Sequence, residues 1–248
     1  MDHVLLEITG PVATITLNRP EALNALTPAM LQRLCELFTQ LGDDEAIKVI
    51  VFTGAGKAFT AGVDLKSLNK ITPVNGQISD KVDKPGQKLT QIMSDLPKPI
   101  IGKVNGFCFT GGLELALACD LLYAANEAKL GDTHAKWGIR PSWGMSQRLP
   151  RRVGTLMARE MTYTARFVGG EEAARIGLVN QAVPREELDA TVAKVCEQIV
   201  DNSSETVTAC KNLYHATDGM SLQDGLNYEW STIYPISDTA ERLAEFIK

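Results

Sequence analysis

The stretch that decides the fold is residues 104–120, VNGFCFTGGLELALACD. It follows an apolar run at 99–104 that we expect to be a strand, and its two glycines, Gly111 and Gly112, open a helical pattern of Leu and Ala residues. Glycines at a helix entrance leave backbone N–H groups uncovered, and the first-turn N–H groups of a helix have no internal partner. This corner is therefore suited to holding an oxyanion or a phosphate.

Glu114 follows Gly111 by three residues, about one turn into the expected helix, with apolar residues on both sides. A carboxylate in a first turn often does no more than complement the positive end of the helix dipole. The segment alone therefore leaves two interpretations open, a dipole-favourable side chain or a reactive carboxylate.

The composition describes an ordinary globular protein of one large or two small domains. Of its 248 residues, 44% are hydrophobic and 22% are charged, which excludes global disorder. The net charge of −5 and the absence of blocks of like charge predict no nucleic-acid partner. No uncharged apolar run approaches the roughly 18–20 residues of a membrane span, and no apolar signal core precedes the first strand, so we expect neither membrane insertion nor secretion.

The five cysteines are odd in number and show no C-x-x-C spacing. This pattern is typical of reduced, mostly buried thiols in a cytoplasmic protein and predicts neither a disulfide framework nor a zinc site. We accordingly expect no metal. The cysteines are Cys35, Cys108, Cys119, Cys196 and Cys210.

Strand signals dominate the first half of the chain. Two strands are expected at 4–8 and 12–17, a helix starting at Thr27-Pro28, and a buried strand at 48–53 that ends in Gly54-Ala55-Gly56. Residues 59–65 then lead into another helical start, so a buried strand twice ends in a glycine-containing corner that opens a short helix. Residues 69–86, rich in Asn, Pro, Gly, Asp and Lys, are predicted to be a mobile surface loop.

Helical signals dominate the second half, after an expected strand at 121–125 and an irregular stretch from 129 to 144. The pattern is helical from Gln147 onward, and a mixed α/β (α+β) body followed by a helical region is predicted. The expected helices are at about 155–164, 171–176, 186–201, 204–217, 221–231 and 238–247.

Five segments in this order resemble the crotonase (enoyl-CoA hydratase/isomerase) family along essentially the whole chain. They are residues 17–26 (LNRPEALNAL), 56–66 (GKAFTAGVDLK), 104–120, Gln147-Arg148-Leu149 with Val153-Gly154, and 170–184 (GEEAARIGLVNQAVP). The resemblance implies a spiral of repeated ββα units, expected over 1–190, and a C-terminal helical trimerisation region, expected over 191–248, that also contributes to the coenzyme A site. It further implies an acyl-CoA thioester partner, a homotrimer or dimer of trimers, and no cofactor beyond the coenzyme A of the substrate.

The resemblance assigns the two glycine corners a chemical purpose. The backbone N–H groups of Val63 and Gly111 match the donors that stabilise a thioester enolate, and losing one such donor typically costs roughly 3–4 kcal/mol of barrier. The alternative is that both corners only permit tight turns. Ala25, Ala61, Asp64 and Leu65 match positions lining the coenzyme A groove, and Lys66 matches a basic position near its phosphates, where a solvated surface lysine is the alternative.

The catalytic side chains match the family unevenly. Hydratases of the family use two glutamates, one to activate water and one to handle the α-carbon proton. Glu114 matches the first, whereas the second position falls on His134. An imidazole could act there as acid or base, oriented by Asp132 if the segment is extended. Alternatively, His134 is a hydrogen-bonded pocket residue without a proton-transfer role. The missing carboxylate argues against a simple double-bond isomerase.

Trp143 is a second departure, because relatives usually carry a small residue there whereas this chain has Pro141-Ser142-Trp143-Gly144. Its ring would narrow the acyl pocket if it points inward. The alternative is a ring packed under the corner with its N–H satisfied.

The leading interpretation is an acyl-CoA enzyme of fatty acid metabolism, a lyase of the enoyl-CoA hydratase type, that adds or removes water at a 2-enoyl-CoA. Two alternatives stay open. One is another crotonase reaction, such as hydrolysis of a β-keto carbon–carbon bond, and the other is a coenzyme A-binding homologue without hydratase activity.

Overall fold

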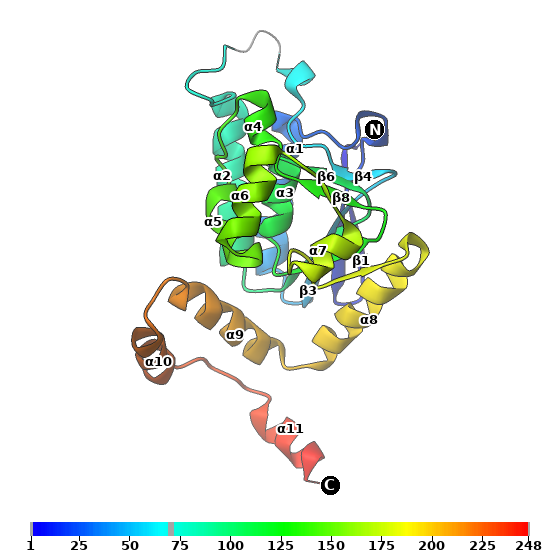
Figure 1. The fold of residues 1–248 in the computed structure, drawn as a ribbon. Coiled ribbons are helices and arrows are strands. Elements are labelled where there is room, and N and C mark those ends of the chain that lie inside the picture. Colours follow the sequence, from blue (N-terminus) through cyan, green and yellow to red (C-terminus); the bar gives the residue numbers. More distant parts are fainter. Residues whose placement is uncertain (1, 69–71, 248) are drawn as a thin grey trace.

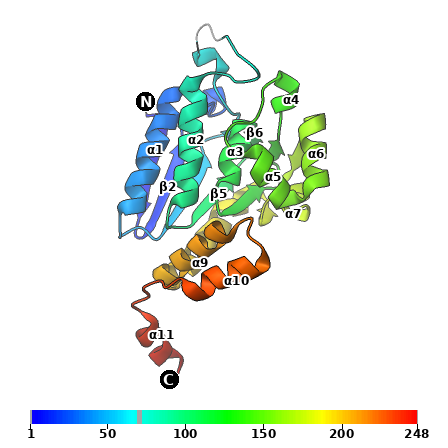
Figure 2. The same ribbon diagram turned by 90° about the vertical axis from the view of Figure 1, so that its left-hand side faces the viewer.

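Two sheets form the body of the protein (Figures 1 and 2), and the computed structural model describes residues 2–68 and 72–247. The six-stranded sheet has the order β1-β2-β3-β5-β7-β10, in which only the β1–β2 pair is antiparallel. Its strands are β1 (Val4–Thr9), β2 (Val12–Leu17), β3 (Val49–Gly54), β5 (Ile100–Val104), β7 (Leu121–Ala125) and β10 (Gln181–Val183). The four-stranded sheet, β4-β6-β8-β9, contains β4 (Ala58–Thr60), β6 (Phe107–Phe109), β8 (Lys129–Gly131) and β9 (Val168–Gly169).

The chain alternates between the sheets. β3, β5 and β7 enter the large sheet, and each is followed at once by a strand of the small sheet, β4, β6 or β8. A helical segment then returns the chain to the next turn, which confirms the predicted spiral of ββα units. Because β3 is covered on both faces, all six of its residues are buried and it reads as a nearly continuous apolar run.

Helix α1 (Pro28–Asp43) follows the predicted signals. The Thr27 hydroxyl accepts a hydrogen bond from the Met30 N–H at 3.2 Å, and Pro28 occupies the first position. The helix places Phe38 edge-to-face against Phe52 of β3, with ring centroids 5.5 Å apart. Phe52 in turn makes an edge-to-face pair with Phe59 of β4, with centroids 5.1 Å apart. Pairs of this kind contribute about 1 kcal/mol each beyond the burial of their area.

Helix α2 (Asp80–Asp95) corrects the expectation of a loop over 69–86. Residues 69–71 lie outside the described residues, but from Asp80 onward the loop prediction is wrong. The Ser79 hydroxyl caps the helix by accepting from the Lys81 N–H at 3.2 Å, and aspartates occupy its first turn. The Pro85-Gly86 pair, which reads as a loop signal, lies inside the helix.

Gly86 is explained by the side chain that lies against it. A Cβ built on Gly86 would lie 2.0 Å from Cε2 of Trp143, and one built on Gly111 would lie 2.8 Å from Cζ3 of the same indole. The indole therefore fills the space between α2 and the start of α3 (Gly111–Leu117), and both flanking positions have room only for glycine.

The remaining helices agree with their predicted positions to within a few residues. The short α4 (His134–Trp137) is an addition, because it lies in the stretch expected to be irregular. The others are α5 (Met145–Val153), α6 (Thr155–Thr164), α7 (Gly170–Arg175), α8 (Leu188–Asp201), α9 (Ser204–Thr217), α10 (Leu222–Ser231) and α11 (Thr239–Phe246).

The C-terminal helices differ in how they meet the body. α8 buries Leu188, Val192 and Cys196 against the large sheet, so the expected division between 190 and 191 falls inside this helix. α10 and α11, which are fully described, contain no buried residue and extend away from the sheets (Figures 1 and 2). Among residues 2–68 and 72–247, no helix combines the length and apolarity that crossing a membrane requires.

We predict that Gly86→Ala destabilises the protein although it improves helix propensity. Alanine gains about 1 kcal/mol over glycine in a helix interior, but here its Cβ would overlap the Trp143 indole, and overpacking of this kind costs about 1–3 kcal/mol. We expect a net loss in the free energy of unfolding measured by urea denaturation.

Gly42→Ala in α1 is the matched control, because its Cβ would meet Leu96 at an ordinary 3.6 Å. It should be neutral or stabilising. A Gly86→Ala protein as stable as the wild type would contradict the packing described for Trp143.

Candidate active site

The structure gathers the main predicted site residues around one small cavity. The cavity has a volume of about 70 Å³ and is lined by Val63, Gly111, Glu114, His134 and Trp143, which come from four separate parts of the sequence. Ala61 and Leu65 of the predicted coenzyme A groove also line it.

The corner at Gly111 is held by a strained residue. Thr110 has φ 54° and ψ −116°, which is unusual for a β-branched residue. Its N–H donates to the Gly131 carbonyl at 3.0 Å, its carbonyl accepts from the Glu114 N–H at 3.0 Å, and its hydroxyl bonds the Thr133 hydroxyl. Strain of this kind costs about 1–3 kcal/mol and persists only where surrounding contacts impose it. These contacts therefore fix the direction of the Gly111 N–H.

The corner at Val63 is held by a short parallel bridge to Leu26. The Leu26 N–H donates to the Gly62 carbonyl at 2.8 Å, and the Asp64 N–H donates to the Leu26 carbonyl at 2.9 Å. A Cβ built on Gly62 would lie 3.5 Å from the Gly111 nitrogen, so the two corners touch. Within residues 2–68 and 72–247, the N–H groups of Val63 and Gly111 donate no hydrogen bond to the protein. Their role as oxyanion donors stays a prediction, and this geometry supports it.

Glu114 is a buried carboxylate with one oxygen committed to the fold. Its Oε1 accepts hydrogen bonds from the N–H groups of Trp143, at 2.8 Å, and Met145, at 3.1 Å. Met145 is the first residue of α5, so the carboxylate also accepts a hydrogen bond at the N-terminus of that helix. Its Oε2 faces His134, with Nε2 at 3.5 Å. One oxygen is thus fixed, and the other lies beside the imidazole.

His134 is buried between two carboxylates. Its Nδ1 lies 2.6 Å from Oδ1 of Asp132, and its Nε2 faces Glu114. Burial alone would lower the pKa of His134, but the hydrogen bonds and charges of Asp132 and Glu114 outweigh it and raise the pKa to about 9. The imidazole is therefore protonated at neutral pH.

The contact between Asp132 and His134 was predicted, but not its geometry. The segment is not extended, because Thr133 has φ −104° and ψ 14° and His134 begins α4. Asp132 Oδ1 also accepts from the backbone N–H of His134 at 3.2 Å, which closes an Asx turn ahead of α4. This turn takes the place of the extended segment that was expected.

The predicted coenzyme A residues meet around an arginine whose role the sequence did not reveal. Arg19 Nη1 donates to the Ala25 carbonyl at 2.8 Å and to Asp64 Oδ2 at 2.9 Å. Partial burial would raise the pKa of Asp64, but the hydrogen bond and charge of Arg19 and the N–H groups of Ser67 and Lys66 together outweigh it, and the pKa is lowered. Asp64 Oδ1 accepts from the Lys66 N–H at 3.1 Å. The Asp64 side chain is thus used within the fold, and Lys66 is exposed and does not line the cavity. The signal in the sequence that could have pointed to Arg19 is its place just after an apolar strand.

Trp143 combines the two interpretations that the sequence left open. The ring is packed under the Gly111 corner with only 3% of the residue exposed, and it also lines the cavity. The expectation that a packed ring would have its N–H satisfied is wrong, because Nε1 is buried and has no hydrogen-bond partner among the described residues.

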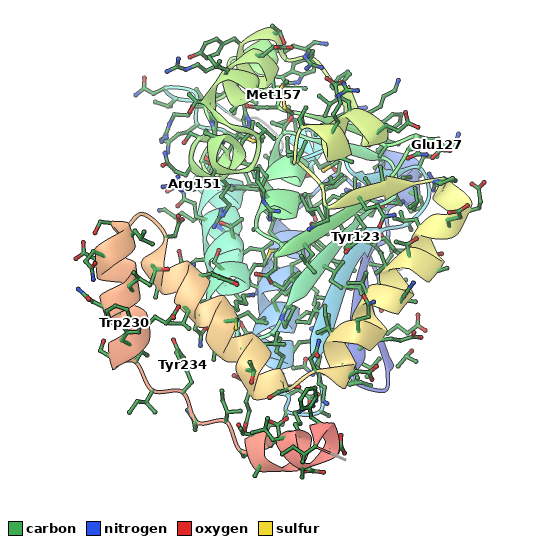
Figure 3. All side chains as sticks on the ribbon, turned by 60° about the horizontal axis from the view of Figure 1, so that its bottom comes forward. Tyr123, Glu127, Arg151, Met157, Trp230 and Tyr234 are labelled. Atoms are coloured by element: carbon green, nitrogen blue, oxygen red, sulfur yellow. The ribbon has the colours of Figure 1, made fainter. Side chains whose placement is uncertain are left out.

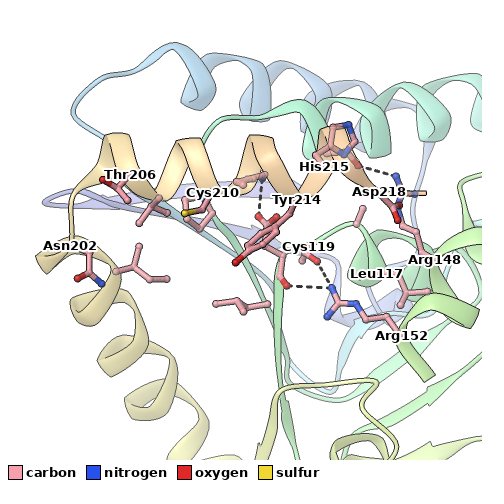
Figure 4. A pocket seen from close by; sticks show the side chains of 18 of the residues that line it. Leu117, Cys119, Arg148, Arg152, Asn202, Thr206, Cys210, Tyr214, His215 and Asp218 are labelled. Carbon is pink, nitrogen blue, oxygen red and sulfur yellow. Dashed lines mark hydrogen bonds and ion pairs between the residues drawn. The ribbon is translucent and has the colours of Figure 1, made fainter. Parts of the chain in front are cut away.

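A larger cavity of about 870 Å³ lies elsewhere, between α5 and α9 (Figure 4). Its cations are already engaged, since Arg152 donates to the Cys119 carbonyl at 2.8 Å and Lys211 to Asp120 at 2.8 Å. Neither Glu114 nor His134 lines it. Across the described parts of the chain, no group of three or more His, Cys, Asp and Glu side chains could hold a metal ion.

Several known proteins are similar to this chain over most of its length. A probable peroxisomal enoyl-CoA hydratase 1 of Arabidopsis thaliana is 40% identical over 217 residues, covering 88% of this chain and 79% of that protein. The short-chain-enoyl-CoA hydratase of Clostridium acetobutylicum is 33% identical over 252 residues, covering 100% of this chain and 95% of that protein. A solved enoyl-CoA hydratase of Bacillus anthracis superposes with a TM-score of 0.92 at 32% identity, covering 99% of this chain and 96% of that one.

The family model for enoyl-CoA hydratase/isomerase matches residues 7–245, nearly the whole chain. The chain therefore belongs to the enoyl-CoA hydratase/isomerase family.

Proposed function

We propose that this protein is a lyase of fatty acid metabolism that adds water to, or removes it from, the carbon–carbon double bond of a 2-enoyl-CoA. The main supporting observation is that the Glu114 carboxylate lies 3.5 Å from the His134 imidazole. Both side chains line one cavity with Val63 and Gly111. The names of the Arabidopsis and Clostridium relatives support the same reaction.

The thioester oxygen would accept hydrogen bonds from the N–H groups of Val63 and Gly111. Addition to the β-carbon moves negative charge onto this oxygen, and donors that are already oriented stabilise that charge with little reorganisation. The two N–H groups belong to corners held by the strained Thr110 and by the bridge to Leu26, so their directions are set before substrate binds.

Two proton transfers complete the hydration. Glu114 Oε2 takes a proton from water as the hydroxide oxygen bonds to the β-carbon, and His134 Nε2 gives its proton to the α-carbon. The products are a protonated Glu114, a neutral His134 and a 3-hydroxyacyl-CoA. Transfer of the proton from Glu114 to His134 across the 3.5 Å gap restores the starting state. Dehydration follows the same steps in reverse.

We predict that Glu114→Gln lowers kcat by at least about 100-fold, because the variant keeps the size of the side chain but removes the base. Acyl-CoA affinity should change little, because the oxyanion donors are backbone groups. The measurement is the ultraviolet absorbance of the enoyl thioester, with a β-ketoacyl-CoA in parallel to detect the alternative carbon–carbon hydrolysis. Full activity in this variant would refute the mechanism.

We predict that hydration by the wild type declines as pH rises through about 9, because the acid must be protonated to act and the His134 pKa is raised to about 9. His134→Gln should lower the rate and lose this alkaline limb. His215→Gln is the matched control, because His215 is half exposed on α9 and does not line the small cavity. An unchanged pH profile in His134→Gln would leave His134 with a packing role alone.

We further propose that the acyl chain is short, because the Trp143 indole occupies the space beside Gly111 and leaves a cavity of about 70 Å³. Trp143→Ala should raise the ratio of kcat/KM for a long-chain over a four-carbon enoyl-CoA by about tenfold or more, since one methylene in a pocket is worth about 1–3 kcal/mol. The ratio should stay near the wild-type value in Tyr163→Ala, because Tyr163 is 74% exposed on α6 and does not line the cavity. An unaltered ratio in Trp143→Ala would contradict the proposed limit.

A homotrimer or dimer of trimers is proposed from the C-terminal helices. Figure 3 shows Trp230 and Tyr234 in the part of the chain that extends from the body. Apolar side chains there are exposed without a covering layer, namely Tyr214, Leu222, Trp230, Ile233, Leu243 and Phe246. Burying such side chains between copies is the ordinary reason for their exposure. Light scattering at micromolar concentration should give three or six times the chain mass of 27.0 kDa, and a monomeric mass would refute this.

We also propose a cytoplasmic protein that needs no metal or cofactor beyond the coenzyme A of its substrate. Five free cysteines, four of them buried, support a reducing compartment. Oxyanion stabilisation by backbone groups supports catalysis without a metal. Activity that a chelator abolishes and a divalent cation restores would contradict the second part.

A further inference from the structure

Asp132 is a completely buried carboxylate whose side chain is hydrogen-bonded to His134 and to Thr162. Oδ1 accepts from His134 Nδ1 at 2.6 Å and from the His134 backbone N–H at 3.2 Å, and Oδ2 accepts from the Thr162 hydroxyl of α6 at 2.7 Å. Among the described residues its only charged partner is the His134 ring. A buried carboxylate is costly unless it is paired and hydrogen-bonded, so this one depends on His134 and Thr162.

These contacts decide which ring nitrogen exchanges a proton. Nδ1 is tied to Asp132, so it keeps its hydrogen in both charge states of the ring. Nε2, which faces Glu114 at 3.5 Å, is left as the nitrogen that gives up and regains a proton. The neutral ring is therefore held in the tautomer that can be reprotonated from Glu114.

We propose that Asp132, itself held by Thr162, is a positioning residue that keeps His134 in the orientation and protonation state required of the acid. The inference rests on the proposed hydration mechanism for the use made of the acid, but the positioning itself is a property of the free protein.

The same segment also ties the acid to the oxyanion corner. The Gly131 carbonyl accepts from the Thr110 N–H at 3.0 Å, and the Thr133 hydroxyl bonds the Thr110 hydroxyl. Residues 131–134 thus set the position of His134 relative to Gly111, which follows Thr110. An aspartate bound to both the ring and the backbone of His134 makes this short segment rigid.

The two carboxylates in contact with the ring both favour its protonated form. Asp132 approaches from its own segment and Glu114 from α3, whereas α6 contributes the neutral Thr162 hydroxyl. The charge of Arg148 of α5 acts on Glu114, and Asp83 of α2 and Arg140 line the same cavity. The pKa of Asp132 is lowered, because its hydrogen bonds to His134 and Thr162 outweigh burial. Neutralising Asp132 leaves Glu114 as the single carboxylate in contact with the ring.

The test is the titration of His134 by nuclear magnetic resonance in the free protein. The chain has only three histidines, so His134→Gln assigns the signal. Asp132→Asn should lower the midpoint by about 1–3 pH units, the usual effect of one adjacent opposite charge. Thr162→Val should lower it by less, and Thr162→Ser, which keeps the hydroxyl, should match the wild type. Thr164→Val, on the same helix but bonded to the Glu160 carbonyl, is the control and should leave it unchanged.

Activity provides the second readout. In Asp132→Asn the alkaline limb of the rate should move to lower pH by the same amount, with kcat reduced and KM for the enoyl-CoA nearly unchanged. A His134 midpoint unaltered in Asp132→Asn overturns the proposal. If that variant does not fold, equal midpoints in the wild type, Thr162→Val and Thr162→Ser overturn it. A shifted midpoint in a protein without hydratase activity would reject the proposed function and leave the positioning role in place.

Discussion

The carboxylate of Glu114 joins two helix N-termini at one point. It belongs to the first turn of α3, and its Oε1 accepts the N–H groups of Trp143 and Met145 at the start of α5. N–H groups at the positive end of α5, which have no partner within that helix, thus meet a negative charge carried by the first turn of α3. This contact holds the Trp143 segment over Gly111 and leaves Oε2 facing His134. Most of the geometry of the cavity follows from it.

The site is therefore a small buried network of charge, with one imidazolium between two carboxylates. Such a network is stable only when every member has its partners, and here each oxygen and ring nitrogen has a hydrogen-bonding or ionic neighbour. A histidine in place of the second carboxylate fits this arrangement well. Two facing carboxylates would repel each other, whereas the Nε2 of a protonated His134 attracts the Glu114 carboxylate.

Local patterns predicted much of this structure. The Thr27-Pro28 start of α1, the buried strands and the Gly111 corner depend on neighbouring residues and on simple periodicity, and all were found as expected. Glu114 and His134 were brought together as the family resemblance implied.

The failures came from contacts between distant segments. Pro85-Gly86 reads as a loop because no local pattern reveals that an indole from residue 143 will lie against that helix. Arg19 was not singled out because its partners, Ala25 and Asp64, meet only in the folded chain. The unpartnered indole N–H of Trp143 likewise depends on packing that the sequence does not show.

The indole between Gly86 and Gly111 also restricts how this protein can evolve. A Cβ at position 86 would lie 2.0 Å from the ring, so a larger residue there packs well only when residue 143 is smaller. Shrinking Trp143 alone leaves a void in the core, and such truncations cost about 3–5 kcal/mol. Each single substitution therefore lowers stability, although the exchanged pair could pack well. Positions 86 and 143 are consequently expected to change together, in lineages with stability to spare.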